Sequence, residues 1–211
     1  MIKLVAFDLD GTIADTIPMC IKAFKRAVTP YTFKKVTKND IVKTFGLNEE
    51  GMIRQVISED WEKALIDFYV IYEQMHTMCF QPFSGIRELI TELKKKSIIT
   101  PLITGKGQRS CDITLRHFEM EALFDSISVG TPDKNTKAES MVKLMLNYNI
   151  QPTEMVYVGD DFSDITACCK VGVRCLSAAW GASPPKIEKL EKENQGYVFN
   201  SIKSLRSFLM G

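Results

Sequence analysis

Two aspartates, Asp8 and Asp10, directly follow a short apolar segment near the N-terminus. That segment, residues 2–7 (IKLVAF), is rich in β-forming residues and predicts a strand buried on both faces. Carboxylates two residues apart in extended backbone start on the same face, and a dry site cannot hold both ionised without a cation or a shared proton. Gly11 then permits a tight turn and a close approach to whatever the carboxylates bind. The plain alternative is an Asp-Gly turn after a core strand.

A second acidic cluster follows another predicted strand. Residues 155–158 are an apolar segment, and Asp160, Asp161 and Asp164 come soon after it. Taken alone, this cluster suits a helix N-cap with acidic residues in the first turn equally well.

A hydroxyl and two lysines occupy comparable positions. Thr104 closes the β-branched segment 97–103, and the helix predicted after it offers backbone N–H groups to an anion. Lys134 lies just before the helix predicted over residues 137–148, and Lys137 is at its start. Because ligands of open α/β sheets bind outside the carboxyl ends of the strands, we expect these clusters to converge there. Five acids, a hydroxyl and a lysine at one edge require a cation and an anion, and Mg²⁺ with a phosphoryl group fits best.

The elements that must position these residues form an interrupted series of strands and helices. After Gly85 the pattern alternates between helix and strand, which predicts parallel strands with right-handed crossovers. Residues 15–80 are instead almost wholly helical, including a long helix over 61–80. We therefore predict an α/β fold: a Rossmann-like parallel sheet flanked by helices, built from residues 1–14 and 82–211. Residues 15–81 form an inserted α-helical cap domain above the carboxyl edge of the sheet.

Composition excludes several partners. The 211-residue chain has a formal net charge of +1, which gives no indication of nucleic acid or of an anionic membrane surface. No apolar run approaches the length of a membrane span. Six cysteines without a C-x-x-C pair or a framework spacing are typical of a reduced, cytoplasmic protein. The two histidines are far apart in sequence, so we expect no zinc site, and nothing in the sequence indicates an oligomeric state.

Four motifs in order resemble those of the haloacid dehalogenase-like superfamily. They are the DLDGT segment at residues 8–12, Thr104, a lysine before a helix, and the GDDFSD segment at residues 159–164. The resemblance covers nearly the whole chain, and the helical insertion resembles the α-helical cap of that superfamily. Residues 82–85 (PFSG) and 179–181 (AWG) resemble the phosphoglycolate phosphatase-like branch.

The resemblance implies catalytic roles for particular residues. Asp8 is expected to attack phosphorus and form an aspartyl phosphate, and Asp10 to act as the general acid–base. Thr104 is expected to hydrogen-bond a phosphoryl oxygen, and a lysine to offset the charge there. The third motif lacks the usual Lys-Pro, so Lys137 is the better match and Lys134 the fallback. Superfamily members that cleave carbon–halogen or carbon–phosphorus bonds lack an acid at the position of Asp10.

The resemblance also implies a Mg²⁺ site. Its expected ligands are the Asp8 carboxylate, the backbone carbonyl of Asp10 and the Asp160 carboxylate, supported by either Asp164 or Asp161. Gly105 stands where the superfamily often has Asn, which is a departure from its pattern.

These expectations lead to a Mg²⁺-dependent phosphatase that acts on small phosphorylated metabolites. We expect Gly105 and Lys106 to contact the phosphate and Lys43 and Arg54 of the cap to contact the substrate. The alternatives are a β-phosphoglucomutase-like sugar-phosphate mutase, which needs a second phosphate grip from the cap, and a catalytically idle phosphate-binding domain.

Overall fold

A six-stranded parallel sheet forms the centre of the computed structural model, which describes residues 1–211. Its order is β3-β2-β1-β4-β5-β6, so the N-terminal strand lies in the middle. The strands are β1 (Leu4–Phe7), β2 (Leu102–Ile103), β3 (Ile127–Ser128), β4 (Met155–Gly159), β5 (Arg174–Ala178) and β6 (Val198–Phe199). The structure thus confirms the predicted α/β class.

Helices cover both faces of the sheet, and alternate residues of β1 explain why. Leu4 and Ala6 pack in one cluster with α7 (Lys137–Tyr148) and α8 (Phe162–Val171). Val5 and Phe7 belong to a second cluster on the opposite face. That cluster includes side chains of α5 (Ile86–Lys95), α6 (Gln108–His117) and α10 (Ile202–Met210). Beyond the sheet, α9 (Pro184–Glu193) contacts α8 and β6.

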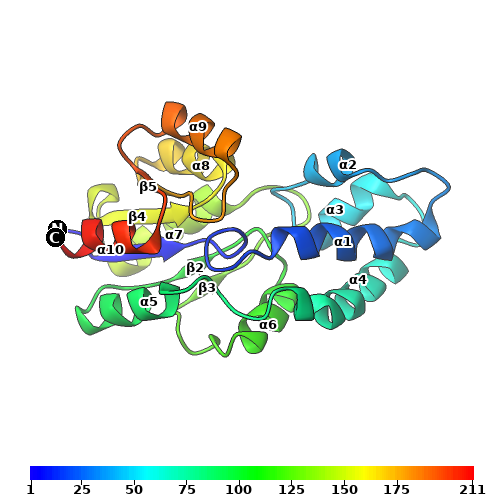
Figure 1. Cartoon of the computed structure of the whole chain (residues 1–211), viewed down its shortest axis with the longest axis horizontal. Helices are drawn as coiled ribbons and strands as arrows, with labels where there is room; N and C mark the ends of the chain where they lie inside the picture. The colour runs from blue at the N-terminus through cyan, green and yellow to red at the C-terminus, as the bar shows by residue number, and fades with distance from the viewer.

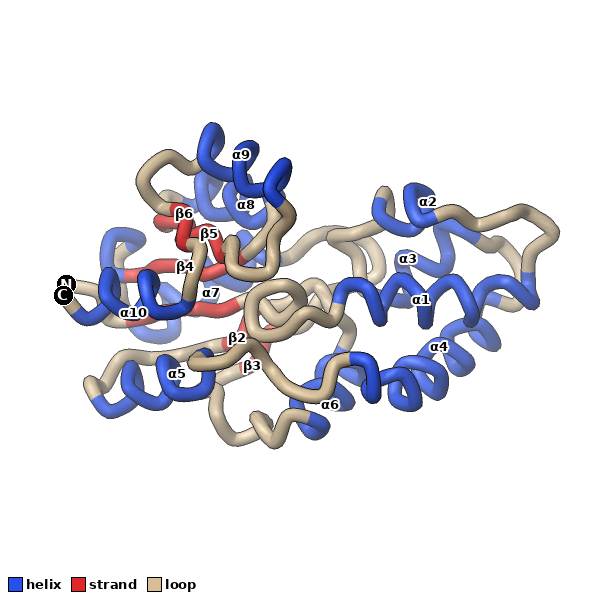
Figure 2. Tube along the Cα trace, viewed as in Figure 1, coloured by secondary structure: helices blue, strands red, loops and turns tan.

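Four further helices form a separate group beyond one end of the sheet, as Figure 1 and Figure 2 show. They are α1 (Ile17–Val28), α2 (Lys38–Val42), α3 (Glu49–Val56) and α4 (Trp61–Met75). Phe24 of α1 and Phe68 of α4 meet edge to face in the interior of this group. None of the helices in the chain is both long and apolar enough to cross a bilayer.

Some helices and strands have other ends in the structure than those predicted from the sequence. The helix expected over residues 61–80 ends at Met75 and continues as a 3₁₀ turn, His76–Met78. The strand expected over 97–103 narrows to two residues, although Ile99 and Pro101 still accept hydrogen bonds from β1. Pro101 has no N–H group to donate to a neighbouring strand, which explains the interruption. Helix α2 begins at Lys38 because Thr37 and Asp40 form a capping box at its N-terminus.

Candidate active site

Asp8 continues β1 at its carboxyl end, where the backbone N–H of Asp8 still donates to Val158 of β4 at 2.8 Å. The chain then turns at Gly11, which has a φ of 77°. A Cβ atom at this position would lie 2.4 Å from Oδ2 of Asp160. Glycine is therefore required twice here, because of the backbone conformation and because the second acidic cluster packs against the turn.

A buried lysine joins the acids from two strand ends. Lys137 Nζ, at the start of α7, lies 2.9 Å from Oδ2 of Asp8 and 2.6 Å from Oδ1 of Asp164. Burial opposes the charge of Lys137, but the two carboxylates outweigh it and hold the pKa of the ammonium well above its ordinary value. Lys134, the alternative for the third motif, is exposed and pairs with Glu139 outside the cavity. The geometry therefore brings Lys137, and not Lys134, to Asp8.

Asp160 follows β4 and carries a partner that the sequence analysis missed. Lys186, in the first turn of α9, lies 2.6 Å from Oδ2 of Asp160. Burial nevertheless raises the pKa of the Asp160 carboxyl to about 6, with Asp164 adding to the effect and Lys186 opposing it. The only sequence signal for Lys186 was its place early in a helix that follows a strand, because the charge-dense helix resembles a solvent-exposed one.

Three buried carboxylates form a group that fits a divalent cation. The oxygens of Asp8, Asp160 and Asp164 lie within 4.8 Å of one another, whereas Asp161 is not a member of the group. Burial, opposed by Lys137 and reinforced by the neighbouring acids, raises the pKa of the Asp8 carboxyl well above its ordinary value. An all-oxygen donor set with excess negative charge is the kind of site that Mg²⁺ occupies.

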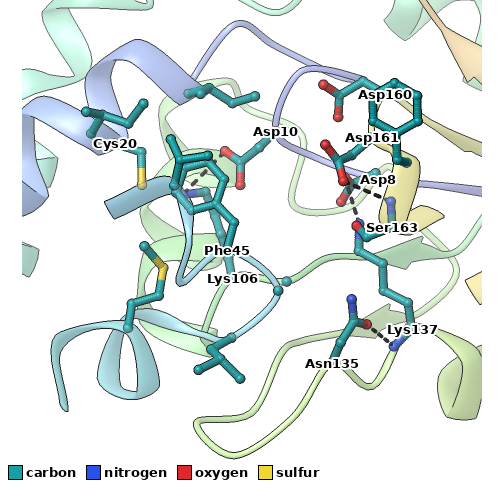
Figure 3. Close-up of a pocket in the computed structure, with 18 of the residues that line it drawn as sticks. Asp8, Asp10, Cys20, Phe45, Lys106, Asn135, Lys137, Asp160, Asp161 and Ser163 are labelled. Carbon is teal, nitrogen blue, oxygen red and sulfur yellow. Dashed lines mark hydrogen bonds and ion pairs between the residues drawn. The ribbon is translucent and has the colours of Figure 1, made fainter. Parts of the chain in front are cut away.

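Asp10 lies at the edge of this group and has its own partners. Its carboxylate accepts a hydrogen bond from the hydroxyl of Thr16, and Lys106 Nζ lies 3.4 Å from Oδ1. The buried ammonium of Lys106 also stands 4.3 Å from the ring centre of Tyr72 in α4. Lys106, which we expected at the phosphate, is thus held between the carboxylate of Asp10 and the aromatic ring of Tyr72. Figure 3 shows Asp10 and Lys106 together beside the cavity.

Thr104 and Gly105 follow β2, which neighbours β1 in the sheet, and Thr104 is buried and does not line the cavity. The Oγ1 atom of Thr104 accepts a hydrogen bond from the backbone N–H of Lys106 at 3.2 Å, which leaves its hydroxyl proton available to an acceptor. Gly105 lines the cavity.

Glu49 of α3, also missed by the sequence analysis, joins the helical group to the sheet domain. Its buried carboxylate accepts hydrogen bonds from the backbone N–H of Gly107, at 2.9 Å, and from the hydroxyl of Ser110. Both donors lie at the N-terminus of α6, where unpaired N–H groups favour an acidic partner. Nearby, the backbone of Asn48 donates to Thr131 at 3.0 Å.

A cavity of about 620 Å³ lies between the acids and the helical group. Figure 3 shows Asp8, Asp10 and Asp160 beside this cavity, with Lys137 near Asp8. Lys43 and Arg54, which we expected to contact substrate, are not among the residues that line it. Arg54 instead pairs with Glu50 one helical turn away and stacks over the ring of Trp61. The positions of Lys43 and Arg54 in the structure therefore do not support the expected substrate contacts.

The chain is similar to several known proteins in sequence and in fold. Over its full length the chain is 27% identical to a protein of Caldanaerobacter subterraneus subsp. tengcongensis provisionally named as the pyrophosphatase PpaX, and 96% of that protein is covered. A phosphoglycolate phosphatase of Vibrio vulnificus is 26% identical over 195 residues, which cover 85% of each chain. The crystal structure of a predicted phosphoglycolate phosphatase from Haemophilus somnus has a TM-score of 0.81 at 17% identity, covering 99% of this chain and 98% of its own, which shows a shared fold. Residues 5–178, which contain all four motifs, match the haloacid dehalogenase-like hydrolase profile, so the chain belongs to that family.

Proposed function

We propose that the protein is a Mg²⁺-dependent phosphatase that hydrolyses small phosphorylated metabolites through an aspartyl phosphate on Asp8. The observation that carries this proposal is the juxtaposition of Asp8, Lys137 and Asp160 at the carboxyl edge of the sheet. In this proposal Asp8 is the nucleophile, Lys137 a fixed positive charge and Asp160 a cation ligand, and all three line one cavity. The direct test is release of inorganic phosphate from 4-nitrophenyl phosphate in the presence of Mg²⁺.

The residues divide the reaction between them. In the first half, an Asp8 oxygen forms a bond to phosphorus while the phosphorus–ester oxygen bond breaks, and Asp10 donates a proton to the departing alkoxide. In the second half, Asp10 takes a proton from water as the water oxygen attacks phosphorus and the bond to Asp8 breaks. Lys137 and the Thr104 hydroxyl stabilise the charge on the phosphoryl oxygens throughout.

Asp8, Asp160 and the backbone carbonyl of Asp10 would hold Mg²⁺, with Asp164 in support. When bound, the ion neutralises phosphoryl oxygens and orients them toward the nucleophile. In the structure both oxygens of Asp164 accept hydrogen bonds, one from Lys137 and one from the N–H of Asp161. We therefore assign Asp164 chiefly to positioning Lys137.

We propose that residues 15–81 act as a cap domain over this site. The cavity is lined from both sides, and Glu49 joins α3 to the N-terminus of α6. A sugar-phosphate mutase must hold a second phosphate from the cap, and neither Lys43 nor Arg54 lines the cavity, so Lys38 is the only cap lysine in position for that contact. All six cysteines are free thiols, which supports a reducing, cytoplasmic compartment.

Replacing Asp10 by Asn should lower turnover of an alkyl phosphate by about 10²–10⁴-fold, as expected for loss of a general acid–base. The loss in the first step should be smaller for 4-nitrophenyl phosphate, because its leaving group needs no proton. Acid-quenched Asp10→Asn protein should then carry phosphate on Asp8, measured by mass spectrometry. Asp15→Asn, which changes an exposed acid of the same loop, is the matched control. Equal losses for both esters would contradict the acid role.

Chelation of divalent cations should abolish turnover, and added Mg²⁺ should restore it. Because the pKa of Asp160 is raised to about 6, its proton must leave before the carboxylate can bind a cation. Mg²⁺ affinity should therefore increase as the pH rises through about 6. Calorimetric titration in two buffers of different ionisation enthalpy should detect proton release on Mg²⁺ binding below this pH. Equal affinity on both sides of this range would contradict the assignment of Asp160.

A further inference from the structure

The two sides of the cavity differ in chemistry. The sheet side supplies carboxylates and ammonium groups, including Asp8, Asp160 and Lys137. The helical group supplies mostly apolar side chains, among them Ile17, Ile21, Val42, Phe45, Leu47 and Met52. A phosphoryl group held at the acids therefore has an apolar wall facing the rest of the substrate.

Two of these apolar side chains are uncovered within the protein. Val42 is 42% exposed and Phe45 is 40% exposed, although both line the cavity rather than the outer surface alone. Leaving such side chains in water is unfavourable, and an apolar group that covers them gains free energy in proportion to the area buried. An aromatic ring also suits Phe45, because rings prefer offset or edge-to-face contact with one another.

Three of the four lysines that line the cavity are paired with carboxylates, which leaves Lys38 as the only lysine there without a carboxylate partner. The ammonium of Lys106 is buried and contacts both the carboxylate of Asp10 and the ring of Tyr72. Lys186 is paired with Asp160. On the cap side, Lys38 is the one lysine that lines the cavity, and its side chain is exposed at the start of α2.

The volume of the cavity also favours a substrate with a bulky apolar portion. About 620 Å³ lies within the range of roughly 300–1,000 Å³ typical of sites that enclose drug-sized ligands. A two-carbon ester or inorganic pyrophosphate would occupy a small part of this space and leave the apolar wall in water.

We infer, on the basis of the phosphatase proposed above, that the preferred substrate is a phosphomonoester whose alcohol carries an aromatic or similarly bulky apolar group. The phosphoryl group binds at Asp8 and Lys137, and the ring packs against Phe45 and Val42. This class differs from the substrates in the names of the relatives, phosphoglycolate and pyrophosphate, which are compact and carry a second anionic group.

The test compares kcat/KM for benzyl phosphate, ethyl phosphate, phosphoglycolate and pyrophosphate with Mg²⁺ present. The three esters all release primary alcohols, so differences among them report chiefly on the contacts of the alcohol portion. We expect benzyl phosphate to exceed ethyl phosphate and phosphoglycolate by about tenfold or more, the discrimination that an apolar pocket provides. A higher kcat/KM for phosphoglycolate or pyrophosphate would overturn the inference.

Variants locate the preference on the apolar wall. Phe45→Ala should lower the ratio of kcat/KM for benzyl phosphate to that for ethyl phosphate by about tenfold. Val42→Lys should raise kcat/KM for phosphoglycolate relative to ethyl phosphate, because it adds a cation to the wall. Phe33→Ala is the matched control, since Phe33 is fully exposed and does not line the cavity. An unchanged ratio in Phe45→Ala would overturn the inference.

The two proposals can fail separately. Hydrolysis of ethyl phosphate without a preference for benzyl phosphate would overturn the substrate class and leave the phosphatase intact. Folded, Mg²⁺-supplied protein that hydrolyses none of the four compounds, nor 4-nitrophenyl phosphate, would overturn both.

Discussion

Asp8→Asn should abolish turnover, with a loss on the order of 10⁴–10⁶-fold, comparable to removal of other covalent nucleophiles. The amide cannot form a stable acyl phosphate, and it also removes a negative charge from the proposed cation site. Two measurements check this result: the steady-state release of phosphate, and the mass of acid-quenched protein, which should show no added phosphate. Mg²⁺ binding by calorimetry should weaken in the same variant.

The matched control for this substitution is Asp133→Asn. Asp133 is exposed and makes no ion pair, so its loss should leave turnover and Mg²⁺ binding unchanged. Thermal unfolding of Asp8→Asn should occur at or above the temperature of the unsubstituted protein in the absence of metal. The physical reason is that burial and the neighbouring acids disfavour the charged form of Asp8, as its raised pKa indicates. Turnover retained within tenfold would exclude Asp8 as the nucleophile.

Lys137→Met should produce the second large effect, a loss of turnover of about 10²–10³-fold, as expected when a preorganised charge is removed from a phosphoryl site. The same change removes the ammonium that bridges Asp8 and Asp164. Removing one partner of a buried ion pair typically costs about 3–5 kcal/mol of stability, because the remaining charges lose their compensation. Turnover at saturating Mg²⁺ and denaturant unfolding should be measured separately, so that the two effects are distinguished.

Lys134→Met is the comparison that makes this result specific. Lys134 is three residues away, exposed and paired with Glu139 on the surface, where such pairs contribute about 0–1 kcal/mol. Its substitution should change turnover less than twofold. A larger loss in Lys134→Met than in Lys137→Met would assign the third motif to Lys134, and small losses in both would exclude both lysines from the site.

The fold and the charged residues at the carboxyl edge of the sheet follow from local patterns in the sequence. Apolar β-forming segments predict buried parallel strands, and ligands of such sheets gather at their carboxyl ends. Asp8, Asp160 and Lys137 were therefore predictable as neighbours although they lie far apart along the chain. Helix α7 has the bounds expected from its apolar spacing.

The tertiary structure determined which charged side chains contact one another or a helix N-terminus. Lys186 reaches Asp160 and Glu49 reaches the N-terminus of α6 only because distant helices pack together, and helical spacing alone contains no such information. Spacing within residues 15–81 also did not indicate which side chains line the cavity, so Lys43 and Arg54 were expected there, whereas the structure has Val42 and Phe45. Residue types and strand order thus determined the chemistry at the sheet edge. Packing between the helical group and the sheet decided which side chains line the cavity opposite the acids, because burial and charge pairing depend on contacts between elements distant in sequence.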